Sequence, residues 1–218
     1  MAKAKPFIKW VGGKSQLIEQ LDAQLPADFG NWENVTYIEP FVGGGAMLFY
    51  MLQRYPNIQH AIINDINPDL ATCYRTVRDT PEQLIESLRD IENAYLAIET
   101  EDGRKDFFMA ARERYNEKNL DPIENSTKFF FLNRTCFNGL YRVNKKGFFN
   151  VPFGKYSNPT ICDPETIRKD SELLQRVEIL NSDFEATFEH AHGDTLFYFD
   201  PPYRPLSDTS SFNDYSKE

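Results

Sequence analysis

The tetrapeptide Asp200-Pro201-Pro202-Tyr203 combines residue types that suit chemistry on an amino group. Two prolines fix the backbone and remove two N–H donors, so the Asp200 carboxylate and the carbonyls of Asp200 and Pro201 form a ledge of hydrogen-bond acceptors. These acceptors can hold amino hydrogens while the nitrogen attacks an electrophile, and Tyr203 can stack on an attached ring. The tetrapeptide is therefore a candidate catalytic site, with an ordinary proline turn as the alternative.

A glycine turn between a predicted strand and a predicted helix is a second candidate site. The strand covers residues 35–39, the turn residues 40–45 and the apolar helix residues 46–52. In a parallel sheet, such a turn lets the backbone approach a ligand closely. Asp65 ends the next predicted strand, residues 60–64, and its carboxylate can accept hydrogen bonds from ribose hydroxyls. The pattern predicts a nucleoside-bearing cofactor, with a turn that binds no ligand as the alternative.

Single residues disfavour two other nucleotide-binding classes. Leu48 stands where the dinucleotide fingerprint has its third glycine, which disfavours an NAD-type dehydrogenase. Gly13-Lys14-Ser15 resembles the end of a phosphate-binding loop, but Ile8 replaces the required first glycine. Trp10 can instead lie against a cofactor, and Lys14 can pair with a carboxylate. A core tryptophan beside a solvated lysine is the alternative.

The aromatic, glycine-punctuated segment from Phe137 to Tyr156 predicts a β-hairpin that contains arginine and asparagine. Residues 1–18 and 125–162 together hold ten lysine and arginine residues and no acid, so all 33 acidic residues lie elsewhere. Although the net charge is −9, these two stretches predict a cationic surface. Arginine can read guanine, asparagine can read adenine, and aromatic side chains can fill the space of an extruded base. A DNA-reading hairpin is favoured over one that packs only on its own domain.

Strands that alternate with helices predict an α/β fold with a doubly wound, Rossmann-like parallel sheet. Helical patterns interrupt this alternation at residues 81–98, 104–118 and 123–135, and strand patterns resume at 177–180 and 195–199. We therefore expect two parts. A sheet domain of about four strands is formed by residues 1–80 and 176–218, and a mainly helical insertion that carries the hairpin is formed by residues 81–175.

Sequence composition indicates the cellular compartment of the protein. No stretch approaches the roughly 18 apolar residues of a membrane span, and the N-terminus lacks the apolar region of a signal peptide. We expect a cytoplasmic protein that does not associate with membranes. Three widely spaced cysteines without a C-x-x-C pair argue against a disulfide framework.

Taken in chain order, six motifs resemble the Dam family of DNA adenine-N6 methyltransferases: Lys9-Trp10-x-Gly12-Gly13-Lys14, Glu39-Pro40-Phe41-x-Gly43-x-Gly45, Asp65, Phe137-Asn138-Gly139-Leu140-x-Arg142-x-Asn144, Phe149-Asn150-Val151-Pro152-Phe153-Gly154 and Asp200-Pro201-Pro202-Tyr203. The resemblance spans nearly the whole chain. It implies the α-type order of cofactor region, target-recognition insertion and catalytic motif. It also implies S-adenosylmethionine as methyl donor, S-adenosylhomocysteine as product, no metal, and double-stranded GATC DNA as substrate.

The resemblance also implies roles for individual residues. Contacts to S-adenosylmethionine are expected from Trp10, Lys14, Asp65 and Asp200, and the same pocket is expected to include Phe41, Gly43 and Asp183. The residues expected to face GATC are Lys9, Leu140, Arg142, Pro152 and Tyr156. Phe137 and Asn138 are expected to act around a flipped adenine and its unpaired thymine. Asp200 and the Pro201 carbonyl would accept the amino hydrogens during direct methyl transfer.

The chain departs from the family pattern at two places. Phe137 stands where some members have tyrosine. The family continues for some tens of residues beyond the point where this chain stops, so the resemblance implies that further strands of the sheet are missing. Three alternatives stay open: an N4-cytosine methyltransferase, an RNA N6-adenine methyltransferase, and a remnant that binds DNA or cofactor without catalysis. We expect a monomer, which in a restriction-modification setting would not contact the cognate endonuclease.

Overall fold

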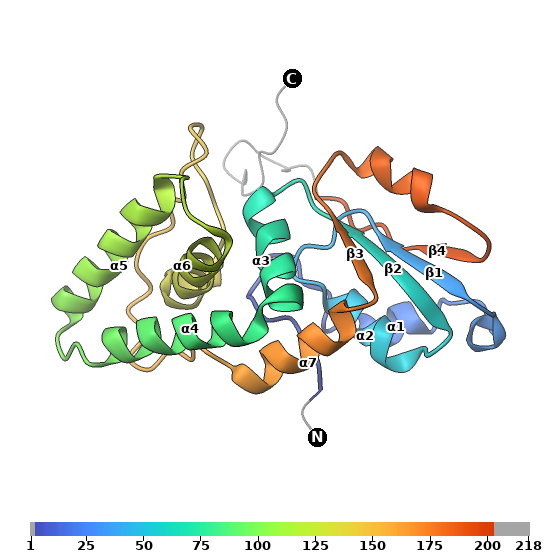
Figure 1. Ribbon diagram of the computed structural model, residues 1–218, viewed down its shortest axis with the longest axis horizontal. Helices are drawn as coiled ribbons and strands as arrows, with labels where there is room; N and C mark the ends of the chain where they lie inside the picture. The colour runs from blue at the N-terminus through green and yellow to red at the C-terminus, as the bar shows by residue number, and fades with distance from the viewer. Residues whose placement is uncertain (1–2, 203–218) are drawn as a thin grey trace.

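The computed structural model describes residues 3–202, and its centre is one sheet of four parallel strands (Figure 1). The strands pair in the order β3-β2-β1-β4, with bounds β1 Val35–Glu39, β2 Ile58–Asn64, β3 Val177–Leu180 and β4 Thr195–Phe197. Every residue of β1 is buried, since this strand lies inside the sheet. The expected α/β class with a parallel sheet is confirmed.

The order of the strands shows how the sheet is wound. From β1 to β3 the chain adds each new strand on the same side, whereas β4 pairs with the opposite side of β1. In Figure 1, α2 (Ala46–Arg54) and α7 (Pro164–Leu174) lie below the strands, and the 3-10 helix η3 (Phe184–His190, orange-red) lies above them. The winding therefore reverses between β1 and β4. In open parallel sheets, ligands bind at the carboxyl ends of the strands near such a reversal.

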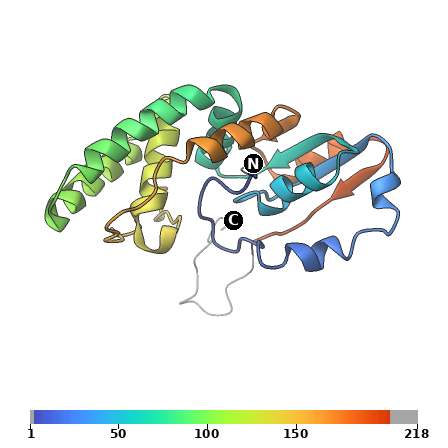
Figure 2. The same ribbon diagram turned by 90° about the horizontal axis from the view of Figure 1, so that it is seen from below.

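A helical insertion lies beside the sheet in both views (Figures 1 and 2). Its helices are α4 (Pro81–Leu96), α5 (Glu101–Asn116) and α6 (Pro122–Thr135), and α3 (Pro68–Asp79) connects them to the sheet. Helix α6 contacts the other three helices, and its side chains from Phe129 to Leu132 are all buried. A helix that is apolar around much of its circumference requires such central packing.

The segment after α6 folds back on itself, as the hairpin prediction requires, but without extended strands. It begins with the 3-10 turn η2 (Phe137–Gly139), and isolated antiparallel bridges join Cys136 to Phe153 and Val143 to Phe149. The side chain of Asn116 in α5 pairs with both backbone groups of Phe149, accepting its N–H at 2.8 Å and donating to its carbonyl at 3.0 Å. We call residues 137–156 the hairpin segment.

Two helices were not anticipated from the sequence, α1 (Ile18–Asp22) and α7. Helix α7 packs against α2, α3 and β3 as well as against α4. These contacts support a proposed boundary between insertion and sheet domain near Asp163, the N-cap of α7, rather than at residue 175. Among the residues described, no helix combines the length and the apolar character needed to cross a bilayer.

Candidate active site

A cavity of about 700 Å³ opens at the carboxyl edge of the sheet. It is lined by residues that follow β1, β2, β3 and β4 and by the N-terminal segment 6–15. The cavity includes every residue that the sequence assigned to the cofactor: Trp10, Lys14, Phe41, Gly43, Asp65, Asp183 and Asp200. Pro201 and Pro202 also line it, whereas Tyr203 lies outside the described residues.

The glycine turn after β1 is held by the carboxylate of Asp65, the residue that follows β2. The backbone N–H groups of Gly43 and Asn67 donate to the two oxygens of Asp65, at 3.1 and 2.9 Å. Burial raises the pKa of Asp65, and these two hydrogen bonds oppose that shift by stabilising the charged form. A half-buried carboxylate is thereby fixed at the cavity wall, where hydroxyl donors of a ligand could reach it.

Trp10 lies directly on this turn. Gly43 has a φ of +49°, and a Cβ added there would be 2.8 Å from Cδ1 of Trp10. Glycine is therefore required both for the backbone conformation and for the close approach of the indole ring. Since Trp10 also stacks on Tyr141 of the hairpin segment, it joins the cavity to the insertion.

Lys14 pairs with Asp200 across the cavity. The Lys14 Nζ lies 2.8 Å from Asp200 Oδ2 and 2.9 Å from the carbonyl of Gly12. Both side chains of the ion pair are about one-fifth exposed, at 19% and 22%. The sequence predicted a carboxylate partner for Lys14 on the ligand, and it did not anticipate that the carboxylate of Asp200, itself a predicted catalytic residue, would be this partner.

Glu39 was given no role from the sequence, although it forms part of a family-like motif. It is the last residue of β1, it is buried and lines the cavity, and it accepts a hydrogen bond from the Tyr37 hydroxyl. Burial and, to a smaller extent, the negative charge of Asp200 raise the pKa of Glu39 to about 8, although the Tyr37 hydrogen bond acts in the opposite direction. An acid at the end of a fully buried strand is the signal that could have identified it.

The raised pKa of Glu39 predicts a pH-dependent stability. Between the ordinary value of 4.5 and about 8, the folded protein holds a proton on Glu39 that the unfolded chain has released. The free energy of unfolding therefore falls as pH rises through this window, by up to about 1.4 kcal/mol per pH unit for one group. In Glu39→Gln the slope should be shallower in urea unfolding between pH 5 and 8. An unchanged slope would contradict the raised pKa of Glu39. Burial also raises the pKa of Asp170 to about 8, so Asp170→Asn serves as a separate comparison.

Three of the predicted DNA-facing residues come together at the base of the hairpin segment. Lys9 Nζ lies 5.1 Å from the ring centroid of Tyr156, and the Tyr156 hydroxyl accepts the backbone N–H of Asn138 at 3.1 Å. The Asn133 side chain ties this region together, because it accepts the Lys9 N–H at 2.8 Å and donates to the carbonyls of Lys9 and Gly139 at 2.8 and 3.0 Å.

The other predicted DNA-facing residues are distributed along the same segment. Phe137 is 51% exposed, and its N–H donates to the carbonyl of Pro152, which is also exposed. Arg142 donates from Nε to the side-chain oxygen of Asn150 at 2.7 Å. Leu140 is half-buried against the core. Asn133 and Asn150 thus support predicted DNA-facing residues, and their individual roles were missed from the sequence.

Comparisons with known proteins identify the family of the chain. Residues 10–218 match the family model of the D12 class N6 adenine-specific DNA methyltransferases. The chain belongs to this family. The methyltransferase therefore has the ancestry that its motifs implied. Family membership implies use of S-adenosylmethionine and a double-stranded DNA substrate.

Several curated relatives of this methyltransferase align over nearly its whole length. The type II methyltransferase M.MjaIII of Methanocaldococcus jannaschii is 46% identical over 99% of this chain and 74% of its own length. The DNA adenine methylase of Vibrio cholerae is 36% identical over 99% of this chain and 71% of its own. The DNA adenine methylase of Escherichia coli is 32% identical over 99% of this chain and 70% of its own length.

Within residues 3–202, no group of three or more His, Cys, Asp or Glu side chains could hold a metal.

Proposed function

We propose that this member of the family methylates N6 of an adenine within GATC, after that base has been flipped out of the duplex, and that the predicted site residues carry out the reaction. The supporting observation is that Asp200, Pro201 and Pro202 line the same cavity as the candidate cofactor residues. Acceptors for an amino group and a place for a methyl donor therefore share one space. A base inside a duplex cannot reach such a site, so flipping is required.

The residues of the cavity fit S-adenosylmethionine in their chemistry. The half-buried Asp65 carboxylate suits hydroxyl donors of the ribose, and Trp10 and Phe41 offer aromatic surface to a cationic or planar group. Lys14 suits a carboxylate. A volume of about 700 Å³ is within the range of pockets that enclose ligands of this size. When bound, S-adenosylmethionine supplies an electrophilic methyl group.

The ion pair of Lys14 and Asp200 supports a specific order of events. Lys14 can exchange its partner from Asp200 to the carboxylate of a bound ligand, because both are anionic acceptors. Asp200 then becomes available to accept an amino hydrogen, together with the Pro201 carbonyl. Withdrawing these hydrogens toward acceptors localises the lone pair of the amino nitrogen, which is otherwise delocalised into the adenine ring. S-adenosylmethionine bound in the cavity would supply the methyl group to this nitrogen and leave as S-adenosylhomocysteine, and Asp200 would accept the displaced proton, so no covalent enzyme intermediate is needed.

The hairpin segment supports recognition of the duplex. Phe137 and Phe148 are 51% and 39% exposed, which leaves apolar surface for the space that a flipped base vacates. Arg142 is partly exposed beside Asn150 and can read guanine in the major groove. Lys9 carries a positive charge at the base of the same segment, next to Tyr156.

A transfer assay with labelled S-adenosylmethionine tests the proposal. Wild-type protein is expected to label adenine N6 in a GATC duplex and not in a scrambled one. Arg142→Ala is expected to lose about 1–3 kcal/mol of transition-state stabilisation on GATC and to discriminate less at one base pair. Arg54→Ala, at the end of α2, is the matched control and should behave as wild type. Equal weakening of Arg142→Ala on every duplex would show a phosphate contact, and label on cytosine or RNA would contradict the proposed substrate.

A further inference from the structure

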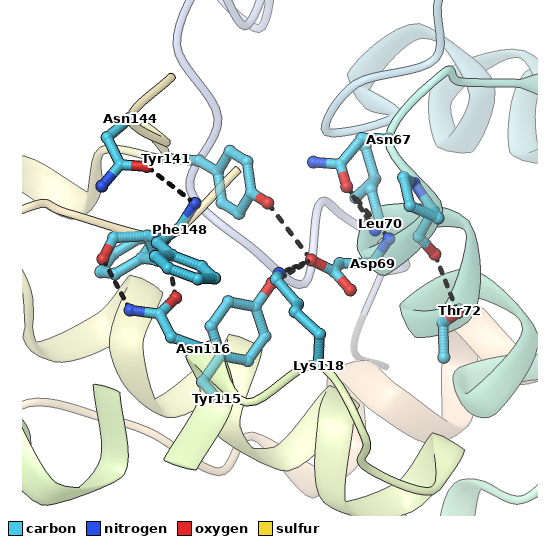
Figure 3. A network of polar contacts seen from close by, with 12 residues as sticks. Asn67, Asp69, Leu70, Thr72, Tyr115, Asn116, Lys118, Tyr141, Asn144 and Phe148 are labelled. Carbon is cyan, nitrogen blue, oxygen red and sulfur yellow. Dashed lines mark hydrogen bonds and ion pairs between the residues drawn. The ribbon is translucent and has the colours of Figure 1, made fainter. Parts of the chain in front are cut away.

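Asp69 of α3 gathers hydrogen-bond donors from two separate parts of the insertion (Figure 3). Its Oδ2 accepts from the hydroxyl of Tyr115 at 2.6 Å and from that of Tyr141 at 3.4 Å, and Lys118 Nζ lies 2.8 Å away. Tyr115 belongs to α5 and Lys118 follows that helix, whereas Tyr141 belongs to the hairpin segment. The Asp69 side chain is only 16% exposed, and its two tyrosine contacts are partly shielded from water, whereas the contact with Lys118 is exposed.

The same carboxylate is tied to the cavity through the start of α3. Asn67 caps this helix by accepting the N–H groups of Asp69 and Leu70 at 3.0 and 3.3 Å. The N–H of Asn67 donates in turn to Asp65, which lines the cavity and holds the glycine turn. Asp69 is therefore linked through Asn67 to Asp65, a residue of the cavity wall.

Tyr141 reaches the cavity by a second route, through its ring. The ring stacks on Trp10 with centroids 5.4 Å apart and planes 24° apart, and on Phe129 at 5.1 Å and 25°. Trp10 lies on Gly43 and lines the cavity. The ring of Tyr141 thus contacts the candidate cofactor site while its hydroxyl contacts Asp69. Its chain neighbours, Leu140 and Arg142, are both among the residues expected to face DNA.

We propose that Tyr141, held by Asp69, is a positioning residue that couples cofactor binding to DNA binding; this rests on the proposed function. A ligand that packs beside Trp10 restricts the indole ring, which restricts Tyr141 and thereby the hairpin segment. The ordering of this segment for DNA is then partly complete before the duplex arrives. Because coupling between two sites is reciprocal, cognate DNA strengthens cofactor binding by the same factor.

Tyr141→Phe tests the coupling, since it keeps the stacked ring and removes only the hydroxyl. The dissociation constant of S-adenosylhomocysteine is measured by calorimetry with and without a GATC duplex. Wild-type protein is expected to bind it at least about fivefold more tightly with the duplex, and this factor should fall toward one in Tyr141→Phe, with about the same affinity in the absence of DNA.

Tyr55→Phe is the matched control, because it also removes a tyrosine hydroxyl that donates to an aspartate, Asp22, at 2.6 Å, but at a site outside the insertion. We expect it to retain the wild-type coupling factor and to lower only the melting temperature. An unchanged factor in Tyr141→Phe would overturn the proposal. An equal loss in both variants would also overturn it, since the effect would then come from a general loss of stability.

Hydrogen exchange separates this inference from the proposed function. S-adenosylhomocysteine should slow amide exchange over residues 140–150 in wild-type protein and not in Asp69→Ala. If wild-type protein transfers no methyl group to DNA, the proposed function is wrong. If it transfers methyl groups but the ligand leaves exchange over residues 140–150 unchanged, only the coupling proposal is wrong.

Discussion

Asp200→Asn is expected to lower kcat for methyl transfer by about 10²–10³-fold, with a smaller effect on the KM for S-adenosylmethionine. The amide keeps one acceptor oxygen but replaces the other with an NH₂ group, which repels the amino hydrogens that a carboxylate would accept. It also removes the ionic partner of Lys14, so the N-terminal segment loses this ion pair with the residues that follow β4. Steady-state kinetics with saturating GATC duplex measure both parameters.

Asp183→Asn provides the matched control in the same cavity. Asp183 lines the cavity and caps η3 by accepting the N–H of Glu185 at 3.1 Å, but it is not part of the proline ledge. The expected result is a higher KM for S-adenosylmethionine with little change in kcat. Equal losses of kcat in the two variants would contradict a specific catalytic role for Asp200, as would full activity of Asp200→Asn.

Gly45→Ala is expected to reduce the free energy of unfolding by about 2–4 kcal/mol, through left-handed strain and overpacking together. Gly45 has a φ of +72°, and an added Cβ would lie 2.5 Å from the hydroxyl oxygen of Tyr74 and 3.3 Å from a ring carbon of Phe49. Tyr74 cannot move freely, because it is buried and donates to the carbonyl of Gly43 at 2.9 Å. Urea denaturation followed by circular dichroism measures the loss.

Gly30→Ala is the control for this substitution. Gly30 lies in the 3-10 helix η1 (Phe29–Asn31), its φ is not in the left-handed region, and an added Cβ meets no heavy atom within 4 Å. Its stability should stay within about 0.5 kcal/mol of wild type. A similar loss in both variants would show that glycine content rather than the geometry at Gly45 determines the effect.

Much of the fold could be predicted because the strands are strongly patterned. The strands at residues 35–39 and 177–180 have the predicted bounds, and β2 begins at Ile58, only two residues before its predicted start. Helix α7 was not recognised, since its amphipathic pattern lies within a region already attributed to the insertion. Strand β4 ends at Phe197 rather than at residue 199, where the chain turns toward the acceptor ledge.

The composition of the cavity was predictable, whereas the pairings inside it were not. Motifs at Trp10, Gly43 and Asp65 indicate a ligand site because glycine and acid positions follow from the geometry of parallel strands. The ion pair of Lys14 with Asp200 joins residues 186 positions apart, and local pattern carries no information on such a contact. Asp69 looked like an ordinary first-turn acid of a helix, and only its three donors distinguish it.

The amide of Asn133 has a consequence for engineering new sequence specificity. A hairpin segment transplanted from a relative would bring a backbone carbonyl at position 139, and this carbonyl needs a hydrogen-bond donor from α6. In the host, the side-chain amide of Asn133 must supply this donor, and it must also accept the N–H of Lys9 and donate to the carbonyl of Lys9. Gly139 must remain glycine as well, because a Cβ there would lie 2.4 Å from Cδ of Lys9. The smallest exchangeable module is therefore the hairpin segment together with Asn133 and the residues around Lys9. Grafts that omit these two partners should fold with the hairpin segment displaced.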